Sequence, residues 1–175
     1  FYELMAKKVD LFATDEDEII HVERERDAFT VSIIAPDAGP EPYIRRRFVA
    51  SETDEVRIYM QGGDDELRVT GDADTNMTLR VIGGGDDDRY VVDALTDTVI
   101  EAAGEGIDRI YANVSVTLSD NIEHLSLRKA GGNLDGTGNA LDNKLRGSDG
   151  DNLLMGLEGN DRLFGLAGDD TMIGG

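Results

Sequence analysis

Short apolar runs separated by acidic or glycine-bearing turns recur along most of the chain. These runs are rich in β-branched residues, which is typical of β-strands. The strands predicted in this way are 19–22, 29–35, 56–60, 67–69, 79–82, 90–92, 99–100, 107–111, 114–118 and 122–127. Only the first twelve residues allow a helix, because their apolar positions have the spacing of a short amphipathic helix. Those positions are Phe1, Leu4, Met5, Val9 and Phe12. The pattern predicts an all-β fold with room for one N-terminal helix.

Glycine and proline divide the chain into three segments. Residues 1–50 contain all three prolines and only one glycine, and we expect a β-rich segment there. Residues 51–130 hold most of the predicted strands, which favours a strand-rich, solenoid-like region. Residues 131–175 contain 12 of the 21 glycines, and these glycines are periodic.

The C-terminal segment repeats every nine residues. Counted from Gly147, the copies are 147–155, 156–164 and 165–173, and another starts at Gly174. Positions 1 and 4 are Gly, position 6 is Asn or Asp, and position 8 is Leu or Met. Position 6 is occupied by Asn152, Asp161 and Asp170, and position 8 by Leu154, Leu163 and Met172. A degenerate copy at 138–146 has Asn143 at position 6.

A nine-residue unit with one large apolar side chain cannot bury that side chain alone, so the copies must stack. Stacking brings position 6 of one turn close to its counterpart in another, where two carboxylates repel. A hard cation between the turns removes this repulsion. Carboxylate and carbonyl oxygens in a flexible loop suit Ca²⁺ better than Mg²⁺, which requires a rigid octahedral site.

The repeat resembles the RTX, or haemolysin-type calcium-binding, nonapeptide Gly-Gly-x-Gly-x-Asp-x-U-x, where U is a large apolar residue. The resemblance extends over about 82–175, because 83–93 looks like a single repeat with Asp88 at position 6 and Tyr90 at position 8. A weaker copy is seen at 61–67, with Asp65 at position 6. The family implies a parallel β-roll, a form of β-solenoid, in which two nonapeptides make one coil of 18 residues.

The same resemblance implies which groups hold Ca²⁺. Turn 138–143 would lie beside turn 156–161, and turn 147–152 beside turn 165–170. The implied side-chain ligands are Asp161, Asp170, Asn152, Asn143 and, in the single repeat, Asp88. The implied backbone carbonyl ligands belong to Gly147, Asp149, Gly156, Glu158, Gly165 and Ala167. Asn in place of Asp at position 6 lowers the ligand charge, and position 2 is Ser or Leu where the family has Gly.

Composition narrows the class of function. The formal net charge is −20, which repels nucleic acid and anionic lipid. The chain has no cysteine, which excludes disulfides and thiolate metal sites. No apolar run is long enough for a transmembrane segment. No catalytic motif is seen, and His21 and His124 alternate with apolar residues as strand-surface positions do. We therefore expect a chain that is not an enzyme.

The resemblance implies a calcium-binding segment of a larger secreted bacterial protein, exported by type I secretion machinery and folded outside the cell by Ca²⁺. A second hypothesis is an adhesive or carbohydrate-binding module in residues 1–80, which binds a surface polysaccharide and uses the repeats as a stalk. A third is an enzyme fragment without its catalytic half. Calcium-dependent folding, polysaccharide binding and hydrolase activity distinguish the three.

Overall fold

The computed structural model describes residues 7–71, 76–92, 98–128 and 132–175. The strands are β1 (Lys8–Phe12), β2 (Ile19–Glu25), β3 (Ala28–Ile34), β4 (Ile44–Val49), β5 (Glu55–Gln61), β6 (Glu66–Gly71), β7 (Thr78–Gly84), β8 (Arg89–Val92), β9 (Thr98–Ile100), β10 (Arg109–Ala112), β11 (Val116–Thr117), β12 (His124–Leu127), β13 (Gly136–Thr137), β14 (Lys144–Arg146), β15 (Leu153–Met155), β16 (Arg162–Phe164) and β17 (Thr171–Ile173). The helical content of these ranges is one 3-10 turn, η1 (Pro36–Ala38). No helix in the described part is long and apolar enough to span a membrane. The prediction of an all-β fold is confirmed.

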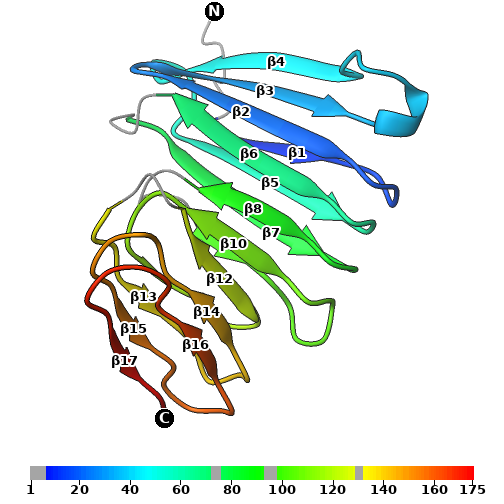
Figure 1. Cartoon of the computed structure of the whole chain (residues 1–175). Helices are drawn as coiled ribbons and strands as arrows, with labels where there is room; N and C mark the ends of the chain where they lie inside the picture. Colours follow the sequence, from blue (N-terminus) through cyan, green and yellow to red (C-terminus); the bar gives the residue numbers. More distant parts are fainter. Residues whose placement is uncertain (1–6, 72–75, 93–97, 129–131) are drawn as a thin grey trace, which may run out of the picture.

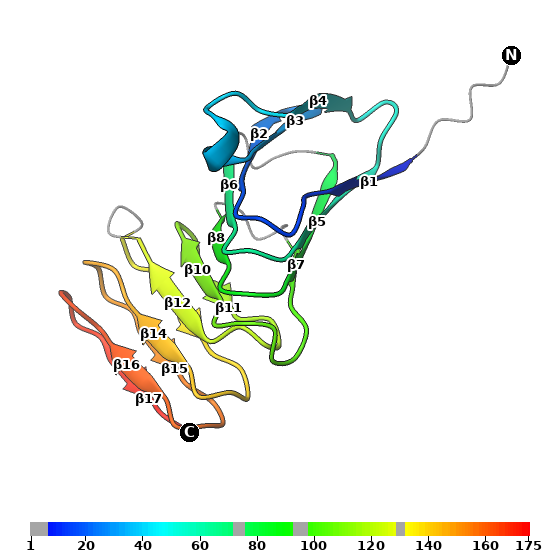
Figure 2. The same ribbon diagram turned by 90° about the vertical axis from the view of Figure 1, so that its right-hand side faces the viewer.

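The strands wind into coils that stack on one another (Figure 1). One nine-stranded sheet runs through the whole stack in the order β16-β14-β12-β10-β8-β6-β2-β3-β4, and its strands from β16 to β2 are parallel. The opposite wall consists of two four-stranded parallel sheets, β1-β5-β7-β9 and β11-β13-β15-β17. Figure 2 shows β6 and β8 facing β5 and β7 across the interior. Strands from all three sequence segments thus belong to one stack.

The coils differ in length. Equivalent positions are 47 residues apart in the first coil and then 23, 20 and 15 residues apart in the coils that follow. The first coil is long because β3 and β4 are inserted as antiparallel strands that extend the edge of the large sheet. In the C-terminal repeats the separation is 18 residues, as the resemblance to RTX repeats implies.

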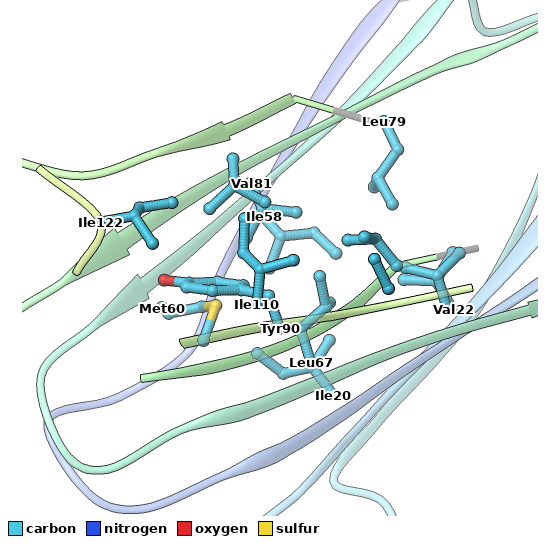
Figure 3. Packing of buried hydrophobic residues seen from close by; sticks show 14 of the residues in the cluster. Ile20, Val22, Ile58, Met60, Leu67, Leu79, Val81, Tyr90, Ile110 and Ile122 are labelled. Carbon is cyan, nitrogen blue, oxygen red and sulfur yellow. The ribbon is translucent and has the colours of Figure 1, made fainter. Parts of the chain in front are cut away.

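One row of apolar side chains runs along the large sheet and forms part of the core. This apolar row is Ile20, Leu67, Tyr90, Ile110, Leu125, Leu145 and Leu163, in which each residue pairs with the next across neighbouring strands. All are buried except Leu163, which is partly buried and packs against the others. In Figure 3 the ring of Tyr90 lies among Met60, Leu67 and Ile110, with its hydroxyl oxygen at one edge of the group. Position 8 of the repeats therefore contributes to a shared core through Leu145, Leu154 and Leu163, whereas Met172 in the last copy is 52% exposed.

The N-terminal helix is not formed in the described residues. Lys8–Phe12 is strand β1, which pairs in parallel with β5. Leu11 enters the core, and Phe12 stacks on Tyr59 with ring centroids 4.8 Å apart. Pairing with a sheet edge satisfies the backbone of this short segment, so it overrides the helical spacing of its apolar residues. The remaining positions of that prediction, Phe1, Leu4 and Met5, lie outside the described residues.

Candidate metal centre

A second row of side chains runs beside the apolar row and contains most of the buried acidic groups. We call it the inner row: Glu18, Asp65, Asp88, Asp108, Glu123, Asn143 and Asp161. Each member lies immediately before a strand of the large sheet and two residues before a member of the apolar row. Side chains two apart on a strand share a face, so these polar groups point toward the interior. Asp65, Asp88 and Asp108 are at most 3% exposed.

Backbone amides connect the inner row from coil to coil. In five of the steps the backbone N–H of one member donates to the side-chain oxygen of the member in the next coil. These bonds run from Glu18 to Asp65 (2.7 Å), Asp65 to Asp88 (3.0 Å), Asp88 to Asp108 (2.9 Å), Asp108 to Glu123 (2.8 Å) and Asn143 to Asp161 (2.9 Å). At the opposite side of the roll, the N–H of Asn152 donates to Asp170 Oδ1 at 2.9 Å. Each of these carboxylates uses one oxygen as a backbone acceptor.

Four of the turns that end in Asp share one backbone conformation. Positions 2 and 4 both have positive φ in the turns that end at Asp65, Asp88, Asp161 and Asp170. The residues with this conformation are Gln61 and Gly63, Gly84 and Asp86, Leu157 and Gly159, and Leu166 and Gly168. Leu157 and Leu166, with φ of 74° and 81°, stand where the RTX pattern has Gly. They adopt the left-handed conformation that glycine adopts without steric cost.

The turns that end in Asn are built differently, and neither 138–143 nor 147–152 contains a residue with positive φ. Asn143 Oδ1 accepts the N–H of Asn139 at 2.7 Å, and its Nδ2 donates to the carbonyls of Ile122 and Glu123. Asn152 repeats this arrangement, because its Oδ1 accepts the N–H of Ser148 and its Nδ2 donates to the carbonyl of Leu134. The side-chain amide thus fills the inside of the turn. The ligand role of Asn143 and Asn152 stays a prediction.

Asp161 fits a cation. Its Oδ1 accepts the N–H of Asn143, but its Oδ2 is buried and has no hydrogen-bond partner in the described structure. A buried carboxylate oxygen without a donor is costly unless a proton or a cation lies beside it. Asp170 lies in the same position in the next turn. A Cβ on Gly156 or Gly165 would come within about 2.2 Å of the Oδ2 of Asp161 or Asp170, so glycine at position 1 gives the carboxylate its room.

The predicted backbone ligands divide into two groups. Gly147, Gly156 and Gly165 are buried, whereas Asp149, Glu158 and Ala167 are exposed at the turn. The carbonyl oxygen of Gly156 faces Gly138, and that of Gly165 faces Gly147, each 2.5 Å from where a Cβ would stand. The strand registers confirm that turn 138–143 lies beside 156–161 and turn 147–152 beside 165–170. That these carbonyls bind an ion stays a prediction.

The comparisons agree with this geometry in the C-terminal coils. Residues 137–175 match a family described as RTX calcium-binding nonapeptide repeat (4 copies). These residues carry RTX repeats. No curated protein and no solved structure is significantly similar to the chain. RTX repeats bind Ca²⁺, so the match implies calcium binding by this part of the chain.

Asp88 lies outside the RTX match but inside a cluster of buried carboxylates. Oxygen atoms of Asp88, Glu101 and Asp108 lie within 4.8 Å of one another. Burial, the largest effect, raises the pKa of Asp88 to about 7, that of Glu101 to about 8 and that of Asp108 to about 6, and the neighbouring carboxylates add to each rise. Burial likewise raises the pKa of Asp65 to about 8. The sequence-predicted Asp88 therefore has partners that sequence reasoning did not find.

Glu101 and Asp108 were missed because the upstream coils have no fixed period. The signal that could have found Asp108 is an acidic residue two positions before a strand-forming apolar residue, Ile110, as in the RTX repeats themselves. Asp65 matches the same rule with Leu67, and its copy at 61–67 stacks directly on residues 83–92 of the single repeat. Glu101 follows β9 on the opposite wall, and only the folding of the coil brings it close.

Proposed function

We propose that this chain is a calcium-folded segment of a secreted protein, in which Ca²⁺ bound between the turns of the RTX repeats completes the C-terminal coils. The observation that supports this most directly is the buried, unpartnered Oδ2 of Asp161 inside a matched repeat. Asp161 and Asp170 would be the side-chain ligands. The role is one of binding and folding rather than catalysis.

The charge of the chain supports a role for the cation in folding. A net charge of −20 opposes compaction, and the inner row concentrates part of that charge in the interior. Divalent cations that bind only the folded chain stabilise it by mass action. The loss of Ca²⁺ would therefore loosen the coils.

RTX repeats are typical of secreted proteins, which supports an extracellular location and export by type I secretion machinery. Extracellular calcium modules bind their ion with dissociation constants of about 10⁻⁴ to 10⁻³ M, so they are empty in cytosol and filled outside the cell. Because the sites would be empty in the cytosol and filled outside the cell, the chain would stay expanded before export and fold afterwards.

The test is a Ca²⁺ titration of the whole chain monitored by far-UV circular dichroism, with Mg²⁺ as the control ion. We expect a β signal that grows with Ca²⁺ and only weakly with Mg²⁺. An Asp161→Ala, Asp170→Ala variant would shift the midpoint to at least about tenfold higher Ca²⁺. The matched control, Asp37→Ala with Glu41→Ala, loses the same two charges at exposed positions and should titrate like the unmodified chain. Equal behaviour of both variants would contradict the proposal.

A further inference from the structure

The outer face of the large sheet carries a row of basic side chains. Because side chains alternate along a strand, the residue before each member of the apolar row points away from the core. In β8, β10, β12, β14 and β16 these residues pair with one another across neighbouring strands. Figure 1 shows the five strands side by side along the stack. We call these residues the basic row: Arg89, Arg109, His124, Lys144 and Arg162.

A second outward row, two residues further along the same strands, adds aromatic rings to this face. Arg146 pairs with Phe164 across β14 and β16. The guanidinium of Arg89 lies 5.7 Å from the ring centroid of Tyr111, and the ammonium of Lys144 lies 5.8 Å from that of Phe164. Phe164 is 45% exposed. The face therefore presents cations beside aromatic rings at regular intervals.

The repeat itself does not require these cations. Positions 7 and 9 of a repeat flank the inward position 8, so they point outward on either wall. On the large sheet they are Lys144, Arg146, Arg162 and Phe164. On the opposite wall they are Leu153, Met155, Thr171 and Ile173. The two walls stack in the same way, so folding alone does not account for basic residues on one of them.

Most of the basic row has no carboxylate partner. Arg89 pairs with Glu66 at 3.8 Å. The members that form no ion pair in the described part of the chain are Arg109, Lys144 and Arg162. Arg109 Nη2 instead lies 2.9 Å from His124 Nδ1, and the pKa of His124 is lowered by burial first and then by Arg109 and Lys144. The row repels itself, and an anion bound on this face would relieve that repulsion.

The spacing of the basic row indicates the charge density of its partner. Neighbouring strands lie about 4.8 Å apart, so the row extends over about 19 Å with one side chain at each step. Duplex DNA carries one negative charge per about 1.7 Å of its axis, which is far denser. Asp87 and Asp142, which line grooves together with Arg109 and Lys144, also oppose a densely charged polymer. A linear polysaccharide of uronic acids fits better, because each sugar carries one carboxylate and a sugar ring is about as long as the strand spacing.

We propose that the outer face of the large sheet, from β8 to β16, binds a linear acidic polysaccharide with one carboxylate on each sugar. The carboxylates pair with the basic row, and the sugar rings pack on Tyr111 and Phe164. The polysaccharide-binding module considered from the sequence was residues 1–80, whereas this surface lies in 89–164. It is separate from the proposed binding of Ca²⁺, which uses carboxylates that face the interior.

The test is binding of the whole chain to immobilised polygalacturonate, which has one carboxylate on each sugar, by biolayer interferometry at constant free Ca²⁺. We expect binding that weakens as NaCl is raised, because salt screens exposed charges. Dextran, which is a neutral polysaccharide, and duplex DNA should each bind at least about tenfold more weakly.

Lys144→Gln with Arg162→Gln removes two members of the basic row that have no carboxylate partner among the described residues. It should weaken binding to polygalacturonate about two- to thirtyfold, the range for the loss of two exposed ion pairs. The matched control, Lys7→Gln with Arg26→Gln, also loses one Lys and one Arg at exposed positions, but outside the row. The control should bind like the unmodified chain.

Arg89→Gln with Arg109→Gln repeats the test upstream of the RTX match, so altered Ca²⁺ binding by the repeats cannot explain its effect. Circular dichroism checks that each variant is folded at the Ca²⁺ concentration used, and this upstream variant decides if the other does not fold. Equal binding by the row variants and the control would overturn the proposal, because Ca²⁺ on the acidic turns would then hold the polymer. Absence of binding to polygalacturonate would also overturn it, and tighter binding to duplex DNA would assign the face to nucleic acid instead.

Discussion

At the scale of single residues, the difference between Asp and Asn at position 6 decides how a turn is completed. Asn carries its own donor, and the Nδ2 groups of Asn143 and Asn152 bond to carbonyls of the preceding coil. Asp has no such donor, and Asp161 Oδ2 is buried without a hydrogen-bond partner among the described residues. Within one RTX array, two turns are thus completed by a side-chain amide, and we propose that a bound cation completes the two turns that end in Asp.

Asn152→Asp tests this division. The substitution removes the donor to Leu134 O and Ser148 Oγ and places a carboxylate beside Asp170. In calcium-free buffer we expect a loss of about 1–3 kcal/mol in the free energy of unfolding, measured by urea denaturation. Saturating Ca²⁺ should recover most of it. Asn113→Asp changes the charge equally at an exposed position and should do neither.

At the scale of elements, the regularity of the repeat decides how much of the fold could be predicted from the sequence. The nonapeptide period predicts very short strands that stack, because a single copy cannot bury its apolar side chain alone, and the resemblance to RTX repeats implies the 18-residue coil and the pairing of turns. The upstream coils of 47, 23, 20 and 15 residues have no such period, so the closeness of Glu101 on the opposite wall to Asp88 was not predictable. The prediction of a helix over the first twelve residues is wrong for the described residues 7–12. There, backbone pairing of β1 with β5 outweighs the helical spacing of the apolar residues.

Leu166 tests the turn itself. Its φ of 81° is strained for any residue with a Cβ. Leu166→Gly should therefore be more stable than Leu166→Ala by about 1 kcal/mol, the reverse of the usual order of these two residues. Thermal unfolding of both variants in saturating Ca²⁺ measures the difference. Thr171 is an exposed strand position without positive φ, so Thr171→Ala should be more stable than Thr171→Gly.

At the scale of the whole molecule, the buried carboxyls of the inner row and their neighbour Glu101 make the stability of the fold depend on pH. The pKa values of Asp65, Asp88, Glu101 and Asp108, raised by burial to between about 6 and 8, exceed the value of about 4 in the unfolded chain. Their protonated forms therefore favour the fold. That contribution is complete below about pH 4 and is lost as the pH rises through about 6 to 8. Glu55 acts oppositely, because hydrogen bonds from Arg57 and Lys8 lower its pKa to about 2.

We accordingly expect the calcium-free chain to unfold at a higher temperature at about pH 5.5 than at about pH 8, by differential scanning calorimetry. Ca²⁺ requires ionised carboxylates, so at saturating Ca²⁺ this difference should shrink or reverse. A calcium-free chain that is more stable at about pH 8 would mean that these carboxyls are ionised in the fold without a cation.

The inserted strands β3 and β4 show that the stack fixes the register between coils but not the length of a coil. A coil that contains them is 47 residues long, yet it meets its neighbours in the same register as a coil of 15. The feature that the coils share is one polar and one apolar side chain, two residues apart, at the start of the strand on the large sheet. The number of residues in the rest of a coil can therefore vary. The loop from Asp37 to Glu41, at the tip of this insertion, is accordingly the place where a foreign peptide could be grafted and displayed, whereas Tyr43 must be kept because its hydroxyl donates to Glu18 Oε1 at 3.2 Å.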